Sequence, residues 1–204
     1  MRLVYSNEDL DVPAGALYLY NRHDRNHITD QLAQAEAEDV KRNFGDRDGT
    51  VKHFEENLSG VAHNGHIVVI AHSDGKTLRT LRRTDARWNG TTFVDRMRIA
   101  GLFDNPVVRF YLVACNAADG FAADLYRALR VRYVPSDNYP LEVTAANGTT
   151  QVYPSGKVGV NLNWSMTFWS CFCMGYAWTT FTDDAPVPEE QRGLTAQEMM
   201  AAIV

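Results

Sequence analysis

Two short apolar runs constrain the fold of this 204-residue chain more than any other feature. They cover His66–Ala71 and Val107–Ala114, are rich in β-branched or aromatic residues, and lack alternation with polar residues. Runs of this kind are typical of strands that are buried on both faces of a parallel sheet. His72 follows the first run and Cys115 follows the second. Because ligands bind at the carboxyl ends of strands in open α/β sheets, we expect these two side chains to share one site.

The rest of the chain alternates between strand-like and helix-like segments. Further strands are predicted at Ala16–Tyr20, Gly49–Phe54 and Leu141–Ala146, with a hairpin around Pro154–Gly156. Helices are predicted before Gly45, from Thr91 to Gly101, and from about Asp119 to Leu129. The apolar face of the first helix is expected to hold Ile28, Leu32, Ala35, Val40 and Phe44. This order predicts an α/β fold with a mostly parallel central sheet and helices on both faces.

Composition excludes several classes of protein. The net charge of −5 and the pI near 5.6 do not indicate the basic surface that binds nucleic acid. No stretch is long and apolar enough to span a membrane. The N-terminus turns acidic before any apolar core, so it does not resemble a secretory signal. We therefore expect a cytoplasmic protein, or one exported by a route that needs no signal. The three cysteines, Cys115, Cys171 and Cys173, are too few for a disulfide framework and favour free thiols.

Two further segments allow more than one interpretation. The polar, basic stretch after Gly75 is predicted to be a solvated loop or hairpin, in preference to an anion site. Residues 161–204 are expected to form a C-terminal extension that packs on a core domain of residues 1–160. The aromatic-rich part, Trp164–Phe181, is interpreted as core in preference to a partner-binding patch. A capping box, Thr195–Glu198, predicts a final helix.

His72 and Cys115 together suggest nucleophilic catalysis. A thiol attacks carbonyl carbon well only as thiolate, and the helix predicted after Cys115 would favour that form with its positive end. An imidazole on the neighbouring strand could accept the thiol proton and later protonate the leaving amine. The backbone N–H groups of Gly75 and Cys115 are candidate oxyanion donors. Asp74 either orients His72 or caps a turn, and capping is favoured.

The two strand ends resemble those of the caspase-like cysteine peptidases, clan CD. The resemblance rests on Val69–Gly75 and Tyr111–Asn116, with weaker support from the helix-like Gly120–Leu125 and the strand-like Val143–Gly148. It is closest to the self-processing cysteine protease domains of bacterial toxins. In one departure, Ser73 follows His72 where the family has glycine.

This resemblance implies a caspase-like three-layer fold and hydrolysis of peptide bonds in a protein or peptide substrate, with no cofactor and no catalytic metal. Cys115 would be the nucleophile and His72 the general acid/base. A substrate pocket would be bordered by Ala145, Ala146 and Asn147. A toxin or effector role against one specific protein is a narrower form of the same expectation.

A caspase-like binding module without turnover, with the aromatic C-terminal region as its binding surface, is the main alternative. Ser73 in a nucleophile elbow is rejected, because no histidine follows residue 72 to complete a triad. A Cys-x5-Arg phosphatase is rejected because Phe121 stands where the arginine should be. A metal site built from His23, His27, His63 and His66 lacks further ligands at suitable spacing.

Overall fold

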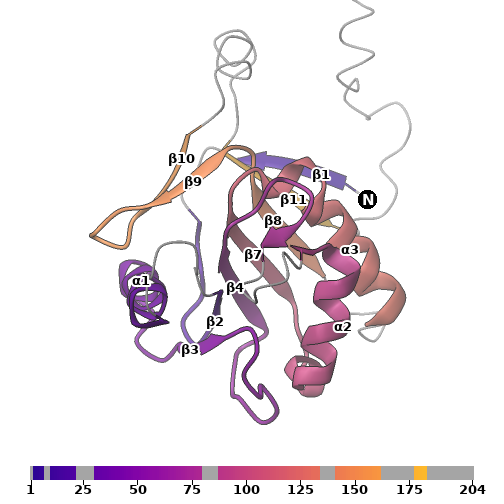
Figure 1. Ribbon diagram of the computed structural model, residues 1–204, viewed down its shortest axis with the longest axis horizontal. Helices are drawn as coiled ribbons and strands as arrows, with labels where there is room; N and C mark the ends of the chain where they lie inside the picture. The colour runs from indigo at the N-terminus through magenta and orange to yellow at the C-terminus, as the bar shows by residue number, and fades with distance from the viewer. Residues whose placement is uncertain are drawn as a thin grey trace, which may run out of the picture.

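The computed structural model describes residues 2–6, 10–21, 30–79, 87–133, 141–161 and 177–182 (Figure 1). Seven strands form one sheet in the order β1-β11-β8-β7-β4-β2-β3. The five strands from β8 to β3 are parallel to one another, and β11 and β1 are antiparallel to their neighbours. The strands are β1 (Arg2–Ser6), β2 (Leu17–Tyr20), β3 (Thr50–His53), β4 (His66–Ala71), β7 (Arg109–Ala114), β8 (Glu142–Ala146) and β11 (Trp178–Thr182).

Helices cover both faces of this sheet. In Figure 1, α1 (Asp30–Asn43) lies on one side, and α2 (Gly90–Ala100) and α3 (Phe121–Arg132) lie together on the other. Two separate hydrophobic clusters, one on each face, fill the space between the sheet and the helices. The predicted α/β class, with a mostly parallel sheet and helices on both faces, is therefore confirmed.

Shorter elements complete the described structure. A hairpin of β5 (Leu78–Arg79) and β6 (Arg87–Trp88) follows the His72 turn, in agreement with the predicted loop or hairpin. A second hairpin, β9 (Thr149–Val152) and β10 (Val158–Asn161), forms around the predicted Pro154–Gly156 turn. Two 3-10 turns, η1 (Leu102–Asp104) and η2 (Ala117–Asp119), follow α2 and precede α3.

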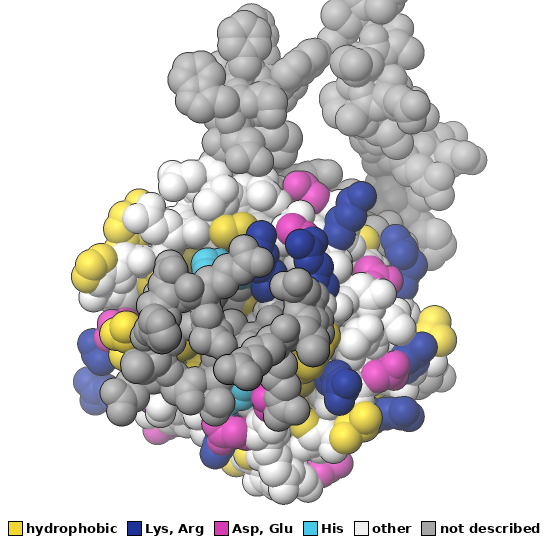
Figure 2. All heavy atoms as spheres, viewed as in Figure 1, with side chains coloured by type: hydrophobic (Ala, Val, Ile, Leu, Met, Phe, Trp, Pro, Cys, Tyr) yellow, Lys and Arg dark blue, Asp and Glu magenta, His cyan; other side chains and the backbone are white. Residues whose placement is uncertain are grey.

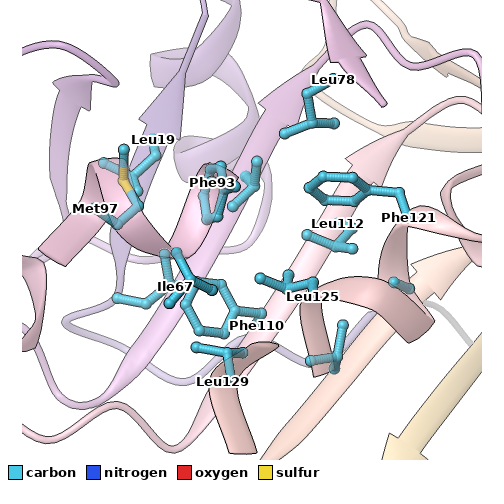
Figure 3. Packing of buried hydrophobic residues seen from close by; sticks show 14 of the residues in the cluster. Leu19, Ile67, Leu78, Phe93, Met97, Phe110, Leu112, Phe121, Leu125 and Leu129 are labelled. Atoms are coloured by element: carbon cyan, nitrogen blue, oxygen red, sulfur yellow. The ribbon is translucent and has the colours of Figure 1, made fainter. Parts of the chain in front are cut away.

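The larger cluster lies between the sheet and the α2–α3 pair. Figure 3 shows Phe93 of α2 near its centre, with Phe110 of β7 and Phe121 of α3 nearby. The ring of Phe93 meets both of these rings edge-on, with centroids 6.3 and 6.1 Å apart. The two helices approach closely at Gly90, where a Cβ would overlap the backbone of Leu125. Glycine is required there because two helix backbones meet.

The buried face of α1 differs from the predicted one. Leu32 is 57% exposed and Ala35 is also exposed, whereas Ala33, Ala37 and Val40 are buried against the sheet. The true stripe was concealed because it contains an acidic residue, Glu36, between the alanines. The expected apolar face was therefore wrong by one position at Leu32 and Ala35 and right at Val40, while Ile28 lies outside the described residues.

The segment predicted to be a C-terminal extension contains one strand of the central sheet. β11 lies inside the sheet, between β8 and β1, and buries Trp178 and Phe181. Strand β1, which was not predicted, pairs with it. The segment beyond residue 160 therefore contributes a strand to the core sheet and does not only pack on it. The rest of the aromatic region, Cys171, Cys173 and the predicted final helix lie outside the described residues.

No helix among the described residues combines the length and apolar character needed to cross a membrane. On the face shown in Figure 2, acidic, basic and hydrophobic side chains are interspersed.

Candidate active site

The register of the sheet brings the two candidate catalytic residues together. In the parallel pair β4–β7, Ala71 lies opposite Ala114, so His72 and Cys115 are the next residues on adjacent strands. Side chains alternate between the faces of a strand, and Ile70 and Val113 belong to the cluster on the α1 side. His72 and Cys115 continue that alternation. Both therefore stand at the carboxyl edge of the sheet on its α1 face.

Cys115 contacts the β9 strand. Its half-buried thiol donates to the carbonyl oxygen of Thr150, at 3.7 Å from Sγ, and Sγ lies 3.5 Å from Thr150 Oγ1. The next residue, Asn116, has a positive φ of 52° and donates its N–H to the carbonyl of Gly148 at 2.7 Å. This backbone turn ends β7 and leads through η2 to the start of α3. The positive end of a helix therefore lies a few residues after the thiol, as predicted.

His72 is exposed, yet its surroundings still change its titration. Partial desolvation lowers the pKa of the imidazole below its usual value, and the positive charge of Arg79 lowers it further. The two residues are tied through the backbone, because Arg79 N–H donates to the His72 carbonyl at 3.0 Å. A lowered pKa keeps the imidazole neutral near pH 7, which is the form that accepts a proton.

The turn after His72 is held by its own side chains. The carboxylate of Asp74 accepts the N–H groups of Thr77 and Lys76, at 2.8 and 3.1 Å, and pairs with Arg87. Burial alone would raise the pKa of Asp74, but the hydrogen bonds from Thr77 and Lys76 and the charge of Arg87 outweigh it and lower the pKa. Asp74 thus caps a turn, the role that the sequence favoured.

Gly75 lies beside the cysteine loop, but its N–H group already has a partner. It donates to Ser73 Oγ at 2.9 Å, while the Gly75 carbonyl accepts the N–H of Phe121 at 2.8 Å. Glycine fits here because its φ is +91°. Ser73, which stands where the caspase-like peptidases have glycine, therefore already accepts a hydrogen bond from the amide that was predicted to bind an oxyanion. Gly75 could take that role only if its N–H left Ser73.

The three predicted substrate-pocket residues occupy different surroundings. Ala145 lies opposite Leu112 and is fully buried in the cluster on the α2–α3 face, so its expected place in a pocket is wrong. Alternation along the strand sends it to the face opposite Cys115. Ala146 is buried opposite Trp178. Asn147 is tied to the β11 region, because its Oδ1 accepts from Thr179 Oγ1 at 2.7 Å.

A pocket adjoins His72 at the point where the strand order reverses. The chain runs outward from β2 to β3 and then crosses to β4 on the other side of β2, a topology whose reversal point is a common ligand site. The pocket lies on the α1 face, between β2, β4, α1 and β9. Its lining residues are Tyr20, Asn21, Ala33, Glu36, Ile70, Ala71, His72, Val113, Thr150 and Val152.

Sequence reasoning missed most of these lining residues. Tyr20 and Asn21 end a predicted strand, so the strand-end argument applied to His72 would have found them. Glu36 was detectable as an acid within an apolar helical stripe. Thr150 carried no signal, because its approach to Cys115 depends on how the β9–β10 hairpin folds back over the sheet.

The described residues contain no cluster of three or more His, Cys, Asp or Glu side chains that could hold a metal ion. His66 instead contacts the hydroxyl of Tyr111, at 3.2 Å from Nδ1. His23 and His27 lie outside the described residues. A scan against protein-family models finds no match for this chain, and a search of curated proteins finds no similar sequence.

Proposed function

We propose that this protein is a cysteine endopeptidase in which Cys115 is the nucleophile and His72 the general acid/base. The observation that supports the proposal is the β4–β7 register, in which Ala71 and Ala114, the residues directly before His72 and Cys115, lie opposite each other. The caspase-like resemblance of these two strand ends adds support. So does the topology, because a mostly parallel sheet with helices on both faces is the fold that the resemblance implies.

The reaction would follow the usual course of thiol acyl transfer. The imidazole of His72 takes the Sγ proton of Cys115, and the sulfur attacks the scissile carbonyl carbon. The resulting imidazolium then protonates the leaving amine, which departs as the C–N bond breaks. In the second half, His72 removes a proton from water, which attacks the thioester and releases the acid and the thiol.

Two hydrogen bonds of the present structure must change for this reaction to proceed. The Cys115 thiol has to leave the Thr150 carbonyl so that His72 can take its proton. The Cys115 N–H, and that of Gly75 once it leaves Ser73, would then be the oxyanion donors. The proposed substrate is a protein or peptide, and a role as a toxin or effector is a narrower form of the proposal.

The same two hydrogen bonds favour a second candidate, a binding module without turnover. In such a protein the thiol and the Gly75 amide would keep their internal partners, and the fold would serve only to present a surface. The two candidates differ in the reactivity of one atom, the Cys115 sulfur.

Labelling with peptidyl acyloxymethyl ketones, which react with an activated cysteine, would test the proposal. We expect an adduct on Cys115 by peptide mass spectrometry and cleavage of a fluorogenic peptide library. Cys115→Ala and His72→Ala should each abolish cleavage while the circular dichroism spectrum stays unchanged. Cys171→Ser and Cys173→Ser serve as controls and should retain cleavage. An unlabelled Cys115, or cleavage that survives Cys115→Ala, would favour the binding module.

A further inference from the structure

The buried stripe of α1 contains one acidic residue. Ala33, Glu36, Ala37 and Val40 follow the i, i+3, i+4, i+7 spacing of a helix face that packs on a sheet. The three apolar members are buried, and Glu36 is partly buried and lines the pocket beside His72. A carboxylate in such a stripe is costly unless something compensates its charge.

The other acids of this part of α1 have basic partners on the same helix. Glu38 pairs with Lys41 at 2.9 Å, and Asp39 pairs with Arg42 at 2.8 Å. The residues three and four positions after Glu36 are Asp39 and Val40, so it has no such partner along the helix. Within the described part of the chain, no lysine or arginine forms an ion pair with Glu36. Burial raises the pKa of its carboxyl group, as expected for an acid without a cation.

The remaining walls of the pocket suit an aliphatic chain that carries a polar end. Ala33, Ile70, Val113 and Val152 supply apolar surface around the carboxyl group. Lysine and arginine side chains bury their methylene stems along apolar surface and keep a charged head at a polar group. A carboxylate is the usual acceptor for such a head, with charge-assisted hydrogen bonds.

We infer that this pocket binds the cationic side chain of a substrate, with Glu36 as the residue that accepts the lysine ammonium or arginine guanidinium. This inference rests on the proposed endopeptidase function, which makes the bound side chain part of a peptide substrate. The pocket is lined by His72 and by Thr150, which itself contacts Cys115. A side chain in the pocket therefore belongs to the residue whose carbonyl is attacked, and the preferred substrates are peptides cleaved after Lys or Arg.

Binding can be tested without turnover in the Cys115→Ala protein. The probe is N-acetyl-L-arginine methylamide, compared with the norleucine derivative, which has an aliphatic chain but no charge. We expect the arginine derivative to shift the backbone NMR signals of Thr150, Val152 and Asn21, and to bind at least about tenfold more tightly than the norleucine derivative. Glu36→Gln should remove most of this difference, and the matched control Glu38→Gln on the same helix should leave it intact.

Three results would overturn the inference. The first is equal binding of the arginine and norleucine derivatives, and the second is no effect of Glu36→Gln on the difference between them. The third is tighter binding of N-acetyl-L-glutamate methylamide than of the arginine derivative, a result that the positive charge of Arg79 near His72 would favour. Glu36→Leu, which continues the apolar stripe, is a second variant if Glu36→Gln proves unstable. Cleavage of peptides by the intact protein separates the two proposals. Binding of the arginine derivative without any peptide cleavage would support the cation-binding pocket and contradict the endopeptidase function. Cleavage without a preference for Lys or Arg would support the endopeptidase function and contradict the cation-binding pocket.

Discussion

The sulfur of Cys115 lies 3.5 Å from the hydroxyl oxygen of Thr150, a residue 35 positions later in the chain. The Thr150 carbonyl accepts the thiol proton, whereas its hydroxyl can rotate to donate to sulfur once that proton is lost. One residue therefore offers a partner to both the neutral and the ionised form of the thiol. The β9 strand that carries it also borders the pocket beside His72.

Replacing Thr150 by valine should slow alkylation of Cys115. The substitution keeps the carbonyl and the side-chain shape but removes the hydroxyl that can donate a hydrogen bond to the attacking sulfur. A hydrogen bond worth about 0.5–1.5 kcal/mol corresponds to a rate roughly two- to tenfold lower at neutral pH. The measurement is the rate of reaction with iodoacetamide, followed by mass spectrometry of the Cys115 peptide. Thr150→Ser keeps the hydroxyl and should react like the native protein; a slow Ser variant would contradict the explanation.

Replacing Arg79 by glutamine should raise the pKa of His72. In the native protein desolvation and the Arg79 charge both lower this pKa, so removing the charge moves it back toward the ordinary value near 6.5. The imidazole accepts a proton only when neutral, so the acid limb of the pH profile of kcat/KM should move to higher pH. Titration of the His72 ring signals by NMR gives the pKa directly. Lys76→Gln, at an exposed cation of the same turn, is the control and should leave both quantities unchanged.

Replacing Gly156 by alanine should destabilise the protein more than the same change at Gly60. Both glycines have positive φ, 81° and 72°, and each alanine pays the cost of that conformation, about 1 kcal/mol. At Gly60 nothing lies within 4 Å of the added Cβ, whereas at Gly156 it would overlap the carbonyl oxygen of Asp39 on α1. We expect an additional loss of about 1–3 kcal/mol at Gly156, measured by urea denaturation. Equal losses of unfolding free energy in the two variants would show that the β9–β10 turn does not contact α1.

Ending the chain after Asn161 should prevent a stable monomer from forming. The truncation removes β11, with its buried Trp178 and Phe181, and leaves β8 as an open edge. Loss of each large buried aromatic costs about 3–5 kcal/mol, which is comparable with the whole stability of a domain. A chain ending after Thr182 is the comparison. Circular dichroism and size-exclusion chromatography should show aggregation or a lost melting transition only in the shorter chain.

The sequence predicted the centre of the sheet well for a physical reason. Strands β4 and β7 are buried on both faces, so nearly every residue in them is apolar and the pattern can be recognised without knowing the neighbours. Because the two strands were predicted to be parallel, His72 and Cys115, which follow them, were expected at the same carboxyl edge of the sheet. The distance of each from its hydrogen-bond partners could not be predicted, because Thr150 and Ser73 approach through turns whose geometry no periodicity encodes.

The periphery was predicted less well because its pattern depends on tertiary contacts. Glu36 interrupts the apolar stripe of α1, and the helix face was therefore assigned one position away. Strand β11 has two threonines between its aromatic residues and a third after them, so it lacks the continuous apolar run of a central strand. Ala145 was assigned to a pocket by family likeness alone, without the strand alternation that sends it into the core.

The pairing of β1 with β11 has a consequence for how the protein is made. β1 is synthesised before all the other described strands, whereas β11, the strand beside it in the sheet, is synthesised after all of them. During translation the early strand has no partner, and its backbone groups stay hydrated or meet a chaperone. This edge of the sheet can therefore close only after β11 has been synthesised, and a nascent chain stalled before β11 would leave both β1 and β8 without a partner on that side.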